Sequence, residues 1–277
     1  MHIQRISASG ACRKIIRTAV FAAALFLSAG LSYAETLKIG ILKNDYFKGT
    51  DELRPFADFI MHSGKYSGYK IVETDSPQET ADALTKGRIN MAFLSIYPSA
   101  IIHRNHQNIP DMVVTANNSL YVKSCIFVLK ESPVKWISDL KNKTVAFSSP
   151  YSTGGYYLSY SHMRKMLYGA PFASLFAESW DDVFTQVFLK KADAGATQYT
   201  DYENVLPPLY KSTFRTIAET ESVPGLFLYI RNDKNKSFLI RSCLVFGNEE
   251  KNRESVINSL SLIDFDWKNL FKSLPVP

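Results

Sequence analysis

Cysteine is scarce in this sequence, with three among 277 residues, and none belongs to a Cys-x-x-Cys pair. This excludes a disulfide-rich miniprotein and disfavours a thiol redox centre or a zinc site. Two of the three, Cys125 and Cys243, lie beyond the N-terminal segment. They could form one disulfide in an oxidising compartment or remain as two buried thiols, and the sequence leaves both alternatives open.

Recognisable catalytic motifs are also missing. The sequence holds no Gly-x-Ser-x-Gly elbow, no His-Glu-x-x-His pair and no Gly-Lys-Ser/Thr phosphate loop. His103 and His106 have the spacing of metal ligands but lack a third partner in the sequence, so a solvated helix face is the better interpretation. Cys125 is a candidate nucleophile without an evident base. We therefore expect no enzymatic activity, no metal and no cofactor.

Excess charge of one sign is largely confined to the start of the chain. The formal net charge is +6, but the first 34 residues hold Arg5, Arg13, Lys14 and Arg17 and no acidic residue. The rest of the chain carries 28 basic and 26 acidic residues. Electrostatic attraction to nucleic acid or to an anionic membrane is therefore not expected.

Residues 1–34 have the pattern of a secretory signal peptide. A basic stretch from Arg5 to Arg17 precedes an apolar run over 18–31, and Ser32-Tyr33-Ala34 forms a small-residue cleavage site. The apolar run is shorter than the roughly 20 residues that a membrane-spanning helix needs. We expect cleavage after Ala34 and a soluble product exported to the periplasm.

The remaining residues alternate strand and helix patterns, which is typical of an α/β protein with largely parallel sheets. Two extended runs, 119–130 and 226–231, divide the pattern into blocks and are interpreted as crossings between two lobes. We expect lobe one over 35–122 together with 226–277, and lobe two over 123–225, with the ligand at the strand ends in a central cleft. The predicted strands are 36–42, 69–74, 91–94, 144–147, 173–178, 192–196 and 214–218, and the predicted helices are 51–63, 76–87, 98–106, 152–168 and 181–191, with helix from 236 to 271.

A polar, glycine-containing turn over 148–156 is the segment best suited to bind a ligand. It leads from the strand Thr-Val-Ala-Phe into a helix that starts near Gly154. Free amides at a helix start carry partial positive charge, and adjacent hydroxyls add donors, so Ser152, Thr153, Gly154 and Gly155 could hold an oxyanion. Simple N-capping of the helix accounts for the same hydroxyls.

The order of several segments resembles the periplasmic substrate-binding proteins of phosphate, phosphite and phosphonate ABC transporters. These segments are LKIGIL, GRINMAFLSIYPSA, DLKNKTVAFSSPYSTGGYYLS, ESWDDVFTQVFLKKADAGA and VPG. The resemblance covers most of 36–231 and implies a two-lobed type II periplasmic binding fold. It also implies capture of a small oxyanion for an ABC permease, with Ser152 and Thr153 at the first two positions of the family's anion-binding motif.

The ligand contacts that the resemblance implies include several departures from the family pattern. Gly154 stands in place of a second serine, Ser76 in place of a tyrosine, and Trp180 in place of a histidine. Leu226 stands where members that bind aminophosphonates have an acidic residue, so an ammonium group on the ligand is not expected. The full set of expected ligand-binding residues is Ser76, Tyr97, Ser152, Thr153, Gly154, Gly155, Trp180 and Tyr199.

These departures predict a less polar pocket than the family pattern, and so a ligand with an apolar part. We expect a monomer. An alternative hypothesis, which the same site would serve, is a ligand-sensing protein that signals to a membrane histidine kinase.

Overall fold

The computed structural model describes residues 35–106, 110–200, 202–203, 208–249, 255–263 and 271. The predicted signal peptide lies outside these residues. Residues 36–277 form one compact unit. No helix in the described part of the chain combines the length and the apolar character needed to cross a membrane.

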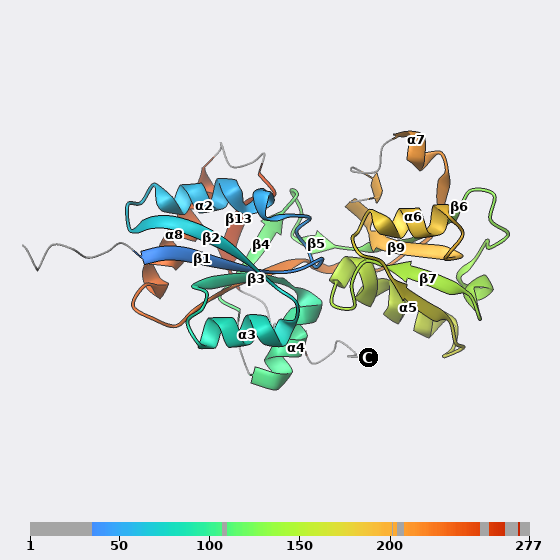
Figure 1. Cartoon of the computed structure of the whole chain (residues 1–277), viewed down its shortest axis with the longest axis horizontal. Coiled ribbons are helices and arrows are strands. Elements are labelled where there is room, and N and C mark those ends of the chain that lie inside the picture. The colour runs from blue at the N-terminus through green and yellow to red at the C-terminus, as the bar shows by residue number, and fades with distance from the viewer. Residues whose placement is uncertain are drawn as a thin grey trace, which may run out of the picture. The chain divides into compact units, whose positions relative to one another are not determined.

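The first lobe is built on a six-stranded sheet with the order β13-β4-β12-β3-β1-β2 (Figure 1). β1 and β3 run parallel, whereas β12 is antiparallel to both β3 and β4. The strands are β1 (Glu35–Leu42), β2 (Tyr66–Thr74), β3 (Met91–Ser95), β4 (Met112–Ala116), β12 (Leu226–Ile230) and β13 (Ile257–Leu262).

Helices cover both faces of this sheet because each carries one apolar stripe. Phe56, Ala57 and Ile60 of α2 (Arg54–Met61) pack in one core cluster with Cys243 of α8 (Lys236–Asn248). Helices α3 (Pro77–Thr85) and α4 (Ile96–His106) contribute to the cluster on the other face. The short helix η1 (Thr50–Leu53) leads into α2.

Local sequence signals explain where α3 begins. The Ser76 side chain accepts a hydrogen bond from the Glu79 amide at 3.1 Å, and Pro77 occupies the first turn. The Glu79 carboxylate in turn accepts from the Asp75 amide at 2.9 Å. The first bond satisfies an amide that the start of a helix leaves free, and the second joins the Glu79 side chain to the residue before the cap.

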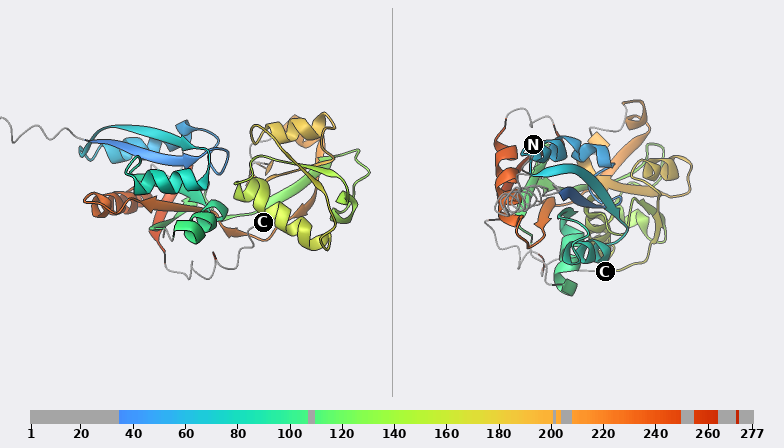
Figure 2. Two further views of the ribbon diagram at one scale, coloured as in Figure 1. Left: turned by 60° about the horizontal axis from the view of Figure 1, so that its bottom comes forward. Right: turned by 60° about the vertical axis from the view of Figure 1, so that its left-hand side comes forward.

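The second lobe is built on a five-stranded sheet with the order β10-β6-β9-β7-β8. Its strands are β6 (Ser124–Leu129), β7 (Thr144–Phe147), β8 (Ala173–Phe176), β9 (Ala194–Gln198) and β10 (Phe214–Glu219). Figure 2 shows α5 (Leu158–Met166) and α6 (Asp182–Phe188) on opposite faces of this sheet. The short helices η2 (Ile137–Leu140), η3 (Thr153–Tyr157) and α7 (Pro208–Lys211) complete the lobe.

The chain passes between the two sheets twice, and the two passages pair with each other. β5 (Tyr121–Val122) and β11 (Val223–Pro224) form an antiparallel two-stranded sheet. The predicted extended run over 119–130 is therefore two strands, β5 and β6, rather than one. The two-lobed α/β fold predicted from the sequence is confirmed.

The prediction of helix from 236 to 271 is wrong beyond α8. This helix ends at Asn248, and 257–262 forms β13, which pairs antiparallel with β4. Ile257 and Leu260 are buried against the sheet. Edge pairing and burial thus determine this segment, where local propensity alone is a weak guide. Residues 264–270 lie outside the described part of the chain.

The two cysteines are free and buried, which confirms the thiol alternative rather than the disulfide. Cys125 lies on β6 of the second lobe and Cys243 on α8 of the first. Each packs in a different apolar cluster, where free cysteine behaves as a small hydrophobic side chain.

Candidate functional site

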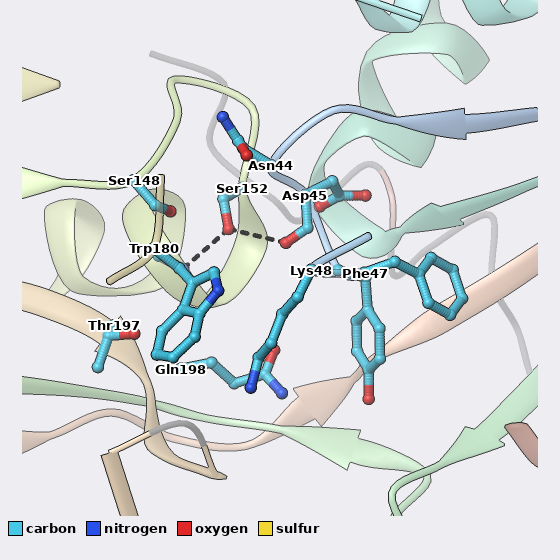
Figure 3. A pocket seen from close by; sticks show the side chains of 11 residues that line it. Asn44, Asp45, Phe47, Lys48, Ser148, Ser152, Trp180, Thr197 and Gln198 are labelled. Carbon is cyan, nitrogen blue, oxygen red and sulfur yellow. Dashed lines mark hydrogen bonds between the residues drawn. The ribbon is translucent and has the colours of Figure 1, made fainter. Parts of the chain in front are cut away.

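A small pocket, partly open to solvent, lies between the two lobes (Figure 3). The loop after β1 forms one wall, and the second lobe supplies the other from the ends of β7 and β9 and the segments around Ser152 and Trp180. The lining residues are Asn44, Asp45, Tyr46, Phe47, Lys48, Ser148, Ser152, Gly155, Trp180, Thr197 and Gln198.

The polar turn singled out in the sequence leads into this pocket. Residues 153–157 form a π-helical turn that continues directly into α5. The Ser152 hydroxyl accepts from the Gly155 amide at 3.0 Å and donates to the main-chain oxygen of Asp45 at 3.1 Å. Ser152 therefore caps the helix and also joins the second lobe to the first. Its predicted contact with a ligand stays a prediction.

The two glycines of the turn are closely packed. A Cβ on Gly155 would lie 2.0 Å from the Ser148 hydroxyl, and a Cβ on Gly154 would lie 2.9 Å from the Cβ of Gln198. Gln198 thus fills the space that the second serine of the family motif would need. The departure at Gly154 therefore has a steric cause in this chain. Gly155 lines the pocket, whereas Gly154 does not and packs against Gln198.

Thr153 fastens the turn to the first lobe. Its Oγ1 lies 2.6 Å from the Ser95 hydroxyl and accepts from the Tyr97 amide at 3.0 Å. All three residues are buried. Thr153 does not line the pocket. Its hydroxyl instead contacts Ser95 and Tyr97 of the first lobe.

Asp45 is a central residue of the site that the sequence reasoning missed. Its carboxylate accepts hydrogen bonds from the Ser95 amide at 2.8 Å and from the Ser95 hydroxyl. The parallel pairing of β1 with β3 places the carboxyl ends of these strands side by side. Asn44 adopts a left-handed conformation with φ of 55°, which asparagine tolerates, and the chain turns Asp45 toward Ser95.

Burial raises the pKa of Asp45 from 3.8 to about 6, although the hydrogen bonds from Ser95 and Thr153 oppose this shift. A carboxyl group whose pKa is higher in the folded state stabilises the fold at low pH, and this stabilisation is lost as the pH rises through about 6. Buried carboxylates with raised pKa values are concentrated at functional sites.

Replacing Asp45 with Asn is expected to raise the melting temperature at pH 8, by roughly 5 °C, and to change it little at pH 4. The reason is that the wild-type carboxyl is ionised while buried only at the higher pH. Thermal unfolding of both proteins across this range measures the effect. Asp139→Asn is the control: the Lys135 and Trp136 amides lower the pKa of Asp139, so this variant should lose stability at neutral pH. Equal melting temperatures for Asp45→Asn and wild type at pH 8 would contradict the assignment.

Two almost fully buried residues on the pocket wall carry hydroxyl groups. Ser148, at the end of β7, is 5% exposed and Thr197, on β9, is 1% exposed. In Figure 3 the Ser148 oxygen faces Ser152 and the Thr197 oxygen faces the side of Trp180. A hydroxyl on a pocket wall can both donate a hydrogen bond to a polar ligand and accept one from it.

Trp180 lines the pocket, and Lys48 from the first lobe lies over its ring at 4.4 Å from the centroid. The predicted contact of Trp180 with a ligand stays a prediction. Three other expected ligand contacts are placed elsewhere. Ser76 caps α3, Tyr97 stacks on Tyr157 with ring centroids 4.4 Å apart, and Tyr199 packs beneath Lys123 with its centroid 3.7 Å from Nζ. The structure does not bring these three into the pocket lining, so their ligand contacts stay predictions.

Metal binding finds no support in the described residues, since no group of three or more His, Cys, Asp or Glu side chains there could hold an ion. The arrangement is a cleft between two α/β lobes, lined by hydroxyl groups, the amides of Asn44 and Gln198, one carboxylate, one ammonium group and an indole. This is the architecture of a two-lobed solute-binding protein.

The model of one family, described as ABC transporter, phosphonate, periplasmic substrate-binding protein, matches residues 48–266. The chain belongs to this family, and its fold is the type II periplasmic binding fold. None of the curated proteins matches the sequence.

Several solved structures share the fold. XAC2383 from Xanthomonas citri bound to ATP is 18% identical with a TM-score of 0.73, covering 87% of this chain and 95% of that one. A binding protein component of an ABC phosphonate transporter, PA3383 from Pseudomonas aeruginosa, is 17% identical with a TM-score of 0.71, covering 87% and 85%. PhnD1 from Prochlorococcus marinus (MIT 9301) in complex with methylphosphonate is 16% identical with a TM-score of 0.68, covering 86% and 97%.

Proposed function

We propose that this protein captures a small oxyanion of the phosphonate and phosphate class in the cleft between its lobes and delivers it to the permease of an ABC importer. The observation that carries the proposal is the pair of hydroxyl groups on Ser148 and Thr197, which line the pocket on the side of the second lobe. The crystal structure of PhnD1 with methylphosphonate supports the ligand class by similarity of fold.

The lining residues suit the parts of such a ligand. The hydroxyls of Ser148 and Thr197 can donate to anionic oxygens, and Lys48 supplies a positive charge at the pocket. The Trp180 ring offers an apolar face and one N–H donor, which suits the carbon substituent of a phosphonate. Thr153 and Gly154 do not line the pocket. Thr153 bonds the turn to the first lobe, and Gly154 packs against Gln198.

Three further features belong to the proposal. The chain is exported to the periplasm after removal of residues 1–34, it acts as a monomer, and it releases its ligand chemically unchanged. Closure of the lobes over the ligand would use the contacts already present between them, such as the bond of 2.9 Å from the Asn44 side chain to the Glu178 main-chain oxygen.

A thermal-shift screen of phosphate, phosphite, methylphosphonate and sulfate tests the proposal. A ligand at 100 times its dissociation constant should stabilise the protein by about 2.7 kcal/mol. The double variant Ser148→Ala, Thr197→Val removes both hydroxyls and should lose most of this stabilisation. Its matched control is Ser179→Ala, on the loop before α6, whose hydroxyl donates to Asp181 and lies outside the pocket lining. No stabilisation of the wild type by any of the four anions would overturn the proposal.

A further inference from the structure

We propose that Asp45 is a specificity-determining residue of the cleft, because its carboxylate holds donors that a ligand oxyanion can use only after displacing it. This inference rests on the proposed function and narrows the ligand class. It predicts that the cleft selects doubly charged tetrahedral oxyanions over singly charged ones of the same shape.

The Asp45 carboxylate already accepts the kind of hydrogen bonds that a bound ligand anion would accept. Two donors meet its carboxylate, the Ser95 amide at 2.8 Å and the Ser95 hydroxyl. The Ser95 hydroxyl also lies 2.6 Å from the Thr153 hydroxyl, which links this group of hydrogen bonds to the second lobe.

The direction of the neighbouring hydrogen bonds reinforces this arrangement. The Ser95 hydroxyl gives its single proton to Asp45, so the bond of 2.6 Å between Ser95 and Thr153 must use the Thr153 proton. The Thr153 oxygen accepts from the Tyr97 amide at 3.0 Å. The hydroxyl chain is thus polarised toward Asp45, and the donors remain oriented for an acceptor in that position.

The charge balance of the pocket points the same way. Among the described lining residues, Lys48 is the one cation and Asp45 the one anion. With Asp45 in place, an incoming anion meets a carboxylate of its own sign and a pocket without net charge. Once Asp45 is displaced toward solvent, its donors and the charge of Lys48 become available together.

The Asp45 carboxylate competes with a ligand anion for the same hydrogen-bond donors. Its effective concentration is high because it belongs to the same chain as these donors. A ligand with one charge has no electrostatic advantage over it and loses the competition. A ligand with two charges and three terminal oxygens gains more from the same donors. Methylphosphonate and methanesulfonate have nearly the same shape but different charge in mildly alkaline buffer, so they form a matched pair of probes.

The test is calorimetric titration of wild type and Asp45→Asn with both probes in mildly alkaline buffer. We expect wild type to prefer methylphosphonate, and Asp45→Asn to bind methanesulfonate at least about tenfold more tightly than wild type does. The preference for the phosphonate should shrink by a similar factor. Asp45→Ala, which removes the carboxylate and adds no donor, is the second variant in case Asn disturbs the fold.

Glu131→Gln is the control, because it removes one negative charge from an exposed side chain outside the pocket lining. It should leave both affinities unchanged. An unaltered preference in both Asp45 variants, or weaker binding of both probes, would overturn the inference while leaving the proposed function standing. Failure of every variant to bind either probe would overturn the proposed function and this inference together.

Discussion

Gly155→Ala is expected to weaken methylphosphonate binding by at least about 100-fold. The added Cβ would lie 2.0 Å from the Ser148 hydroxyl and 3.0 Å from the Ser152 hydroxyl, distances at which the neighbours must move. Both hydroxyls line the pocket. Each lost hydrogen bond to a charged oxygen costs about 1.5 to 3 kcal/mol, or roughly one to two decades of affinity.

Calorimetric titration measures this loss, and thermal unfolding shows whether the variant folds. Gly68→Ala is the matched control, since a Cβ at Gly68 in β2 would meet nothing within 4 Å. The control should bind as wild type does. Wild-type affinity in Gly155→Ala would show that the Ser148 and Ser152 hydroxyls do not contact the ligand.

Thr153→Val should weaken ligand binding by roughly 10- to 100-fold because it breaks the connection between the lobes. Valine keeps the shape of threonine but cannot accept from the Tyr97 amide or donate to the Ser95 hydroxyl. Both groups are buried, so they would lose a partner where water cannot replace it. The closed arrangement, in which the pocket exists, would become less populated.

Titration with methylphosphonate checks this prediction. Thr85→Val is the control, because the Thr85 hydroxyl bonds to the Ala81 oxygen of its own helix at 2.9 Å. A double-mutant cycle with Ser95→Ala should show coupling between positions 153 and 95. Additive effects of the two substitutions would contradict a shared connection between the lobes.

Much of the fold could be predicted because its signals are local. The capping serine and proline at the start of α3 and the apolar stripe of α2 are readable from a few neighbouring residues. The strand β13 was missed because its structure depends on pairing with β4, far away in the sequence. Local propensity in a short mixed segment cannot reveal such a partner.

Only the part of the candidate site formed by the polar turn of the second lobe could be predicted from the sequence. The turn over 148–156, which includes Ser148 and Ser152, has a local signature. Asp45 and Thr197 carry no signature of their own, since their importance comes from strand ends that the topology brings together. Tyr97 lies at the start of α4 and Tyr199 follows β9, and packing against Tyr157 and Lys123 accounts for the positions of their rings.

A crystal structure of the protein with methylphosphonate tests the central claim most directly. The account predicts phosphonate oxygens within hydrogen-bond distance of the Ser148 and Thr197 hydroxyls, with the methyl group against Trp180. It also predicts that the Asp45 carboxylate has left the amide and hydroxyl of Ser95. A ligand bound away from the Ser148 and Thr197 hydroxyls, or an empty cleft at saturating methylphosphonate, would contradict it.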